Sequence, residues 1–226
     1  MKAQPIVIAI DGTSASGKST AARLAAKTLD YIYVDTGAMY RSLAWYCVKN
    51  RIDPQDAAAV ARACRTWKTN LICEEKPARH IRLVINDCFP EKEIRTQEIT
   101  AAASHVAAVP KVREWMKRKQ RECIQFGNLV MEGRDIGTNV FPETDFKFYL
   151  DASLSERARR RDAEGVHDNL AARDARDSQR AAAPLMIALG AVLIDTSGQT
   201  PEQTNHLIIT EFHRRLDDRR QLNRRS

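Results

Sequence analysis

The residues at positions 12–19, Gly-Thr-Ser-Ala-Ser-Gly-Lys-Ser, constrain the fold of this chain more than any other feature. They have the form GxxxxGK[ST] and stand between an apolar run at residues 5–11 and a segment of strong helix formers at residues 19–29. Such a loop binds phosphate only where a buried strand leads into it and a helix leaves it, because backbone N–H groups and the positive helix terminus must converge on the anion. The sequence therefore predicts a strand–loop–helix unit that binds phosphate, against the alternative of a Gly/Ser turn with an incidental lysine.

Each part of this loop has an expected role toward the phosphates of ATP. The glycines allow close approach of the backbone, Lys18 would reach the β- and γ-phosphates, and the Ser19 hydroxyl would be a ligand of Mg²⁺. The residues of the loop expected to bind ATP are Gly12, Thr13, Ser14, Ala15, Ser16, Gly17, Lys18, Ser19 and Thr20.

Length and composition favour a water-soluble enzyme. The chain has 226 residues, of which 43% are hydrophobic, enough for one large domain or one domain with a small insert. The longest apolar run, residues 185–194, is too short to span a bilayer, and the N-terminus lacks the pattern of a secretory signal. The five cysteines never occur in CxxC spacing and the histidines show no metal-ligand spacing. We therefore expect reduced thiols, a cytoplasmic location and no structural metal.

The formal net charge of +7 suggests acidic partners but fits nucleic acid, a membrane surface and small phosphorylated molecules alike. Arginines are concentrated near the C-terminus, where acidic residues dilute them. That segment is interpreted as a solvated helix face, with a nucleic-acid-binding arm as the alternative. Its arginines are Arg214, Arg215, Arg219, Arg220, Arg224 and Arg225.

Strand-like and helix-like segments alternate along most of the chain. This alternation predicts an α/β fold with a five-stranded parallel sheet, right-handed crossovers and helices on both faces. Two further short strands, at residues 71–73 and 80–85, are expected to form a small antiparallel insert. The five strands of the sheet are expected at residues 5–11, 31–35, 129–132, 146–150 and 191–195. Helices are expected at residues 39–49, from residue 54, at 93–107 and at 111–125.

Polar, charged and glycine residues follow each predicted strand of the sheet. In a parallel sheet these positions share one edge, where ligands bind. The segments after the second, third and fourth strands are residues 35–41, 133–138 and 156–161, and all three contain arginine. Phosphate-binding residues surrounded by arginines suit phosphoryl transfer, in which catalysis is mostly positioning and charge neutralisation.

Five motifs together resemble the bacterial cytidylate kinases, a family of nucleoside monophosphate kinases with a P-loop. They are the phosphate loop, DTGAMYR (35–41), EIRTQEI (93–99), EGRDIGTNVFP (132–142) and RDARDSQRAAAPL (173–185). The resemblance covers residues 5–208 and implies a single kinase domain. Its parts would be a core (1–66 and 93–226), a CMP-binding insert (about 67–92) and a mobile lid (about 155–175).

The resemblance also implies roles for individual residues. Arg134 and Arg180 would act with Lys18 in catalysis, since bidentate guanidinium groups suit phosphate. Arg41, Arg134 and Arg180 would hold the CMP phosphate or the group in transit. Asp177 would accept hydrogen bonds from the ribose, and Ser104, Arg113 and Asp135 would recognise the edge of cytosine. The residues implied to bind CMP are Asp35, Thr36, Arg41, Ser104, Arg113, Arg134, Asp135, Asp177 and Arg180. The alternatives are surface ion pairs for the arginines, a solvated helix carboxylate for Asp177 and a helix serine without a role for Ser104.

Three departures from the family's pattern concern ATP and its metal. Arg157 and Arg161 resemble residues that close over ATP, but the stretch between Arg161 and Arg173 is shorter than in many members, which leaves the division of roles among the lid arginines open. The Ser14–Ala15–Ser16 run differs from the residues that are common at these positions of the loop in the family. Glu132 stands where the family often has aspartate, and a water-mediated role toward Mg²⁺ is expected for it.

The sequence thus predicts a cytoplasmic enzyme, expected to be a monomer, that transfers the γ-phosphoryl group of ATP to CMP or dCMP with Mg²⁺. The transfer would be in-line, without a covalent enzyme intermediate or a general base. One alternative is a kinase of the same fold for another small acceptor. A more distant one is a P-loop ATPase that binds RNA through its C-terminal helix.

Overall fold

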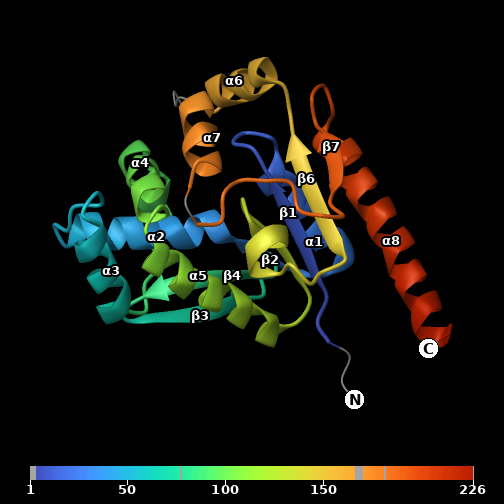
Figure 1. The fold of residues 1–226 in the computed structure, drawn as a ribbon, viewed down its shortest axis with the longest axis horizontal. Helices are drawn as coiled ribbons and strands as arrows, with labels where there is room; N and C mark the ends of the chain where they lie inside the picture. The colour runs from blue at the N-terminus through green and yellow to red at the C-terminus, as the bar shows by residue number, and fades with distance from the viewer. Residues whose placement is uncertain (1–3, 77, 166–169, 181, 226) are drawn as a thin grey trace.

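A computed structural model describes residues 4–76, 78–165, 170–180 and 182–225. Its centre is one seven-stranded sheet in the order β3-β4-β2-β5-β1-β6-β7 (Figure 1). All neighbouring strands run parallel except β3 and β4. The strands are β1 (Val7–Gly12), β2 (Ile32–Asp35), β3 (Thr69–Glu74), β4 (His80–Ile85), β5 (Leu129–Glu132), β6 (Phe146–Asp151) and β7 (Val192–Asp195).

The α/β class with a mostly parallel sheet is confirmed, but the expected number of five strands in the sheet was wrong. The two strands of the expected insert do pair with each other in antiparallel fashion. However, β4 also lies parallel to β2, with Tyr33 opposite His80 and Val34 opposite Ile81. The hairpin therefore extends the main sheet at one edge. Sequence alternation identified both strands but could not show which neighbour each would take.

Helices cover both faces of the sheet (Figure 1). The helices are α1 (Lys18–Leu29), α2 (Thr36–Lys49), α3 (Ala57–Thr66), α4 (Gln97–Val106), α5 (Pro110–Glu122), α6 (Leu154–Ala163), α7 (Leu170–Ser178) and α8 (Pro201–Arg225). Alternate residues of β1 belong to different cores. Val7 and Ala9 pack with residues of α2, α3, α4 and α5, whereas Ile8 and Ile10 pack with residues of α1 and α8. An apolar strand buried on both faces is what a doubly covered parallel sheet requires.

Local sequence explains where several helices begin. The carboxylate of Asp35 accepts from the N–H of Ala38 (2.7 Å), so α2 begins at Thr36, three residues before the expected start. Asp56 accepts from the N–H groups of Ala58 and Ala59 and caps α3, which begins three residues after the expected Pro54. These are favourable N-cap contacts, because the first N–H groups of a helix lack partners within it.

The phosphate loop lies between β1 and α1, as predicted. Gly12 has φ of +146°, and a Cβ there would lie 1.9 Å from the carbonyl oxygen of Leu150 on β6. Gly17 has φ of +84°, in the left-handed region, and directly precedes α1. Position 12 therefore requires glycine, because any Cβ there would collide with β6.

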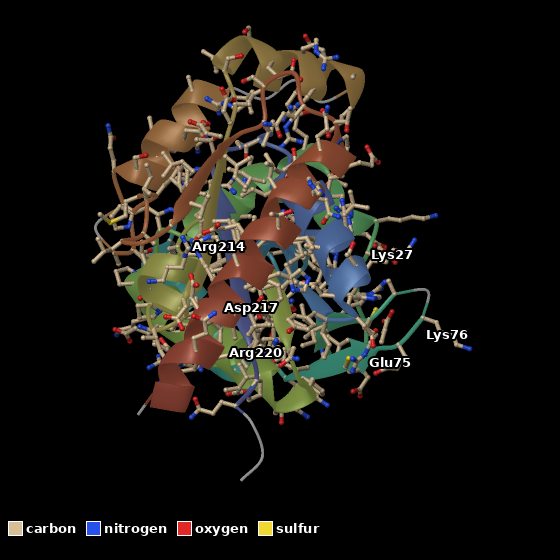
Figure 2. All side chains as sticks on the ribbon, turned by 90° about the vertical axis from the view of Figure 1, so that its right-hand side faces the viewer. Lys27, Glu75, Lys76, Arg214, Asp217 and Arg220 are labelled. Atoms are coloured by element: carbon tan, nitrogen blue, oxygen red, sulfur yellow. The ribbon has the colours of Figure 1, made fainter. Side chains whose placement is uncertain are left out.

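The C-terminal helix α8 packs on the α1 side of the sheet, and its arginines are paired with carboxylates. Arg214 pairs with Glu211 and Asp218, and Arg220 pairs with Asp217. In Figure 2 Arg214, Asp217 and Arg220 follow one another along α8. This agrees with the interpretation of a solvated helix face, although the side chains of Arg224 and Arg225 lie outside the described part. Within the described ranges no helix has the length and apolar character needed to cross a membrane.

Candidate active site at the carboxyl edge of the sheet

A cavity of about 830 Å³ is lined by residues that follow the ends of the strands and by residues of α6 and α7. The phosphate loop forms one end, and residues of α2, α4, α5 and the loop after β5 form the other. Its lining contains ten basic and six acidic side chains, so it suits anions. The cavity is large enough for more than one small ligand.

The buried side chains of the phosphate loop are held by short contacts. Lys18 is buried and its Nζ donates to the carbonyl oxygen of Thr13. The Ser19 hydroxyl donates to Oε2 of Glu132 (2.8 Å), and the Tyr33 hydroxyl donates to Oε1 of the same carboxylate (2.5 Å). Burial raises the pKa of Glu132, and the two hydroxyl donors oppose that shift. Glu132 is therefore fixed at both oxygens, and it lines the cavity together with Ser19.

The outer part of the phosphate loop is held by side chains of α6 and α7. Asp174 on α7 accepts from the N–H of Ser14 (3.0 Å) and pairs with Arg157 on α6. Arg157 in turn donates to the carbonyl oxygens of Ser14 (3.2 Å) and Ala152 (3.0 Å). The buried guanidinium of Arg157 thus links the phosphate loop to α6 and α7, through Ser14 and Asp174, and lies outside the cavity lining. Its expected contact with ATP stays a prediction.

Two other arginines of α6 do line the cavity. Arg160 donates to the carbonyl oxygens of Ala15 (3.3 Å) and Thr196 (2.7 Å), which joins the phosphate loop to the segment after β7. Arg161 also lines the cavity and pairs with Glu164 (2.8 Å). The family resemblance selected Arg157 and Arg161 as residues that close over ATP and did not select Arg160. The arginine-dense run on α6 was the available signal for it.

The three arginines expected to hold phosphate, Arg41, Arg134 and Arg180, all line the cavity, and each forms an ion pair with a carboxylate that also lines it. Asp177 is buried and pairs with both Arg134 (2.9 Å) and Arg180. Arg41 pairs with Asp35 (3.0 Å), and the Nε of Arg41 is buried without a hydrogen-bond partner. Burial lowers the pKa of Arg180 from its ordinary value. A buried donor without an acceptor is costly, and an anionic ligand would remove that cost.

At the far end, a buried ion pair stands where the base was expected. Arg113 donates to Oδ2 of Asp135 (2.5 Å), and the Asn139 amide donates to the same oxygen (2.9 Å). Within the described ranges no hydrogen bond reaches Oδ1 of Asp135, and the Nε of Arg113 is buried without a partner. The guanidinium of Arg113 lies 5.7 Å from the ring centroid of Tyr40, whose pKa burial raises to about 12. The pair thus has one carboxylate oxygen and one guanidinium N–H without a hydrogen-bond partner among the described residues.

The structure brings most of the predicted site residues to this cavity. Ala15 to Thr20 of the loop line it, as do all nine residues implied for CMP, with Ser104 half-buried on α4. Gly12, Thr13 and Ser14 lie outside the lining, at the strand end of the loop. None of the lining residues comes from residues 67–92, so in the described part the insert does not reach the cavity and its role in binding CMP stays a prediction.

Sequence reasoning missed several residues that line the cavity. Arg95 is exposed there and its guanidinium has no hydrogen bond or ion pair among the described residues. Tyr40 and Arg95 both lie inside quoted motifs but were not singled out. Thr196 and Gln199, which follow β7, also line the cavity. Their only signal in the sequence was the polar character of the residues after that predicted strand.

Comparisons with known proteins identify the family of the chain. The family model described as cytidylate kinase matches residues 8–214. A cytidylate kinase of Lactiplantibacillus plantarum is 40% identical over 209 residues, which cover 87% of this chain and 90% of the relative. A bifunctional pantoate ligase/cytidylate kinase of Acaryochloris marina is 40% identical over 94% of this chain and 43% of the relative, so the chain spans less than half of that protein. TT1252 from Thermus thermophilus superposes with a TM-score of 0.46 at 19% identity, over 92% of this chain and 98% of that one, a likeness too distant to bear on the site.

A glycine-rich loop between β1 and α1, at the carboxyl edge of a parallel sheet, defines a P-loop protein of the α/β class. Ten basic side chains line the cavity beside this loop, which suits a ligand that carries phosphate groups. The chain belongs to the cytidylate kinase family, as the match over residues 8–214 establishes.

Proposed function

We propose that this chain transfers the γ-phosphoryl group of ATP to CMP and dCMP, giving ADP and the corresponding diphosphate. The observation that carries the proposal is a single cavity with the phosphate loop at one end and the Arg113–Asp135 pair at the other. Between these ends lie Arg41, Arg134 and Arg180, which suit two phosphate groups that approach each other.

The pairing chemistry supports cytosine as the base. A free carboxylate oxygen of Asp135 would accept from the exocyclic amino group of cytosine, and Arg113 would donate to the acceptors of the ring. Uracil carries a carbonyl oxygen where cytosine carries the amino group, so it would place an acceptor against Asp135. A buried polar group left without its partner costs about 1–3 kcal/mol, which corresponds to roughly 5- to 150-fold in selectivity.

Transfer would proceed in-line, in one step. An oxygen of the CMP phosphate forms a bond to the γ-phosphorus while the bond from that phosphorus to the β–γ bridging oxygen breaks, and that oxygen leaves with ADP. No general base is required, because the attacking phosphate is already ionised near neutral pH. Lys18 and the three arginines would neutralise the charge that spreads over the transferred group.

The residues present also fit Mg²⁺. The Ser19 hydroxyl commits its hydrogen to Glu132, which leaves its oxygen lone pairs available, and Mg²⁺ prefers oxygen ligands. Ser19 would hold the ion, and Glu132 would orient Ser19. Bound there, Mg²⁺ supplies charge neutralisation at the β- and γ-phosphates. The described residues contain no cluster of three or more His, Cys, Asp or Glu side chains able to hold a metal.

Two measurements test the proposal. The purified protein should phosphorylate CMP and dCMP in a coupled assay with ATP, and UMP and AMP much more slowly; activity with AMP but not CMP would overturn the assignment. Asp135→Asn should lower kcat/KM for CMP by about 10- to 100-fold while leaving the KM for ATP within about twofold, because the contacts of this carboxylate are with Arg113 and Asn139 and not with residues of the phosphate loop. Asp56→Asn, which alters an exposed helix cap, is the matched control.

A further inference from the structure

Asp11 is a buried carboxylate that the mechanism above does not use. It lies in β1 immediately before Gly12 and is 4% exposed. Its Oδ1 accepts from the backbone N–H of Ile136 (2.9 Å) and its Oδ2 from the N–H of Gly137 (2.7 Å). Because both oxygens are committed to backbone donors 125 and 126 residues away in sequence, Asp11 is not placed to act as a base or a ligand.

The two N–H groups belong to the first turn of a short π-helical segment, η3 (Ile136–Val140). N–H groups at the start of a helix have no partner within it, and a carboxylate there is favourable. Asp11 therefore caps this turn from another element of the fold. Segments of this kind are uncommon and are frequent at functional sites.

Asp135 stands directly before η3 and is tied to it. Its carbonyl oxygen accepts from the N–H groups of Asn139 (2.9 Å) and Val140 (3.2 Å). Its carboxylate is held by Arg113 and by the Asn139 amide. The side-chain contacts fix the direction of this carboxylate, whereas the cap by Asp11 fixes the backbone from which it extends.

The same strand end carries the other substrate site, because Asp11 is bonded to Gly12 at the start of the phosphate loop. A displacement of η3 would therefore move Asp135 relative to that loop, and with it the neighbouring Arg134. We propose that Asp11 is a positioning residue that fixes the base-recognising loop against the phosphate loop and so sets the preference for cytosine over uracil. This inference rests on the proposed function.

Asp11→Asn tests it with almost no change in volume. The amide keeps one acceptor oxygen but turns an NH₂ group toward the second backbone N–H. We expect the ratio of kcat/KM for CMP to that for UMP to fall at least about tenfold, with the KM for ATP within about twofold of wild type. Asp56→Asn is the control, since Asp56 also accepts from two consecutive backbone N–H groups but lies outside the cavity lining. It should leave the ratio unchanged.

The outcomes are separable. A variant that loses activity equally toward CMP and UMP would show that Asp11 is only structural, and the inference would fail while the proposed function stands. A wild-type protein without preference for CMP would overturn both. Should Asp11→Asn not fold, Asp11→Glu retains the charge and both oxygens but lengthens the side chain by one methylene. Asp11→Glu must also lower the ratio of kcat/KM for CMP to that for UMP, and an unchanged ratio would contradict the inference.

Discussion

Glu132 receives a hydrogen bond on each of its carboxylate oxygens, from Ser19 and from Tyr33, although the three residues come from α1, β2 and β5. Tyr33→Phe removes one donor and frees Glu132 to leave Ser19. Because partners of a metal's ligands commonly alter metal affinity by 10–100-fold, we expect the Mg²⁺ concentration for half-maximal rate to rise about tenfold, with an unchanged KM for CMP. Binding of Mn²⁺ to the ADP complex, followed by electron paramagnetic resonance, should weaken in parallel.

Tyr31→Phe is the matched control for that experiment. Tyr31 precedes β2, and its ring packs edge-on against Phe212 with centroids 6.0 Å apart, well away from Glu132. An Mg²⁺ dependence that is the same in Tyr33→Phe, Tyr31→Phe and wild type would show that the Tyr33 hydroxyl has no part in the metal site.

At the residue scale, the sequence identified groups whose chemistry is local and missed those defined by distant partners. Lys18 and Ser19 follow from a motif of eight residues with a strand before it and a helix after it. Tyr33 and Asp11 looked like ordinary strand residues, because their partners are 99 and 125 residues away. No periodicity or spacing in one sequence reports such contacts; only the resemblance to a family carried Arg134, Asp135 and Asp177 into one site.

At the scale of elements, Asp174 joins helix α7 both to α6, through Arg157, and to the phosphate loop, through the N–H of Ser14. Asp174→Asn removes the charge of a largely buried pair and weakens both links. We expect faster hydrogen exchange over residues 170–178, a KM for ATP raised about 5- to 20-fold, and a loss of about 1–3 kcal/mol in the free energy of unfolding. Hydrogen–deuterium exchange and steady-state kinetics measure these effects.

Ser178→Ala, which removes an exposed hydroxyl from the same helix, is the control and should change none of these three quantities. Equal exchange rates over α7 in Asp174→Asn and wild type would mean that the helix is held by other contacts.

The positions of the strands were predicted well from short, bounded apolar runs. The neighbour of each strand in the sheet was predicted less well. All seven strands were located, yet the hairpin of β3 and β4 was expected to stand apart from the sheet that it extends. The edges of an existing sheet offer unpaired backbone groups to any neighbouring strand, and the side-chain pattern of β4 does not distinguish a separate hairpin from a strand added there.

At the scale of the whole molecule, Asp11 should leave a signature in the pH dependence of stability. Burial, the largest cause, raises the pKa of Asp11 from 3.8 to about 7; Asp135 raises it further, while the N–H groups of Gly137 and Ile136, and Lys18, oppose the shift. A raised pKa means that the folded state holds its proton where the unfolded chain has lost it. The stability this contributes is complete below about pH 4 and is lost as the pH rises toward 7.

The steepest loss would be about 1.4 kcal/mol per pH unit between pH 4 and 7. Asp11→Asn cannot titrate, so its free energy of unfolding, measured by urea titration at each pH, should lack this decline. Other carboxylates, such as Glu211, whose pKa arginines lower to about 2, change the free energy of unfolding below about pH 4.5. They do not produce the decline between pH 4 and 7. The difference between the two proteins therefore isolates Asp11, and parallel curves from pH 4 to 7 would mean that its carboxyl is ionised throughout. A variant that is less sensitive to pH yet less selective for CMP would show that the burial of this charge serves the geometry of the site at the expense of stability.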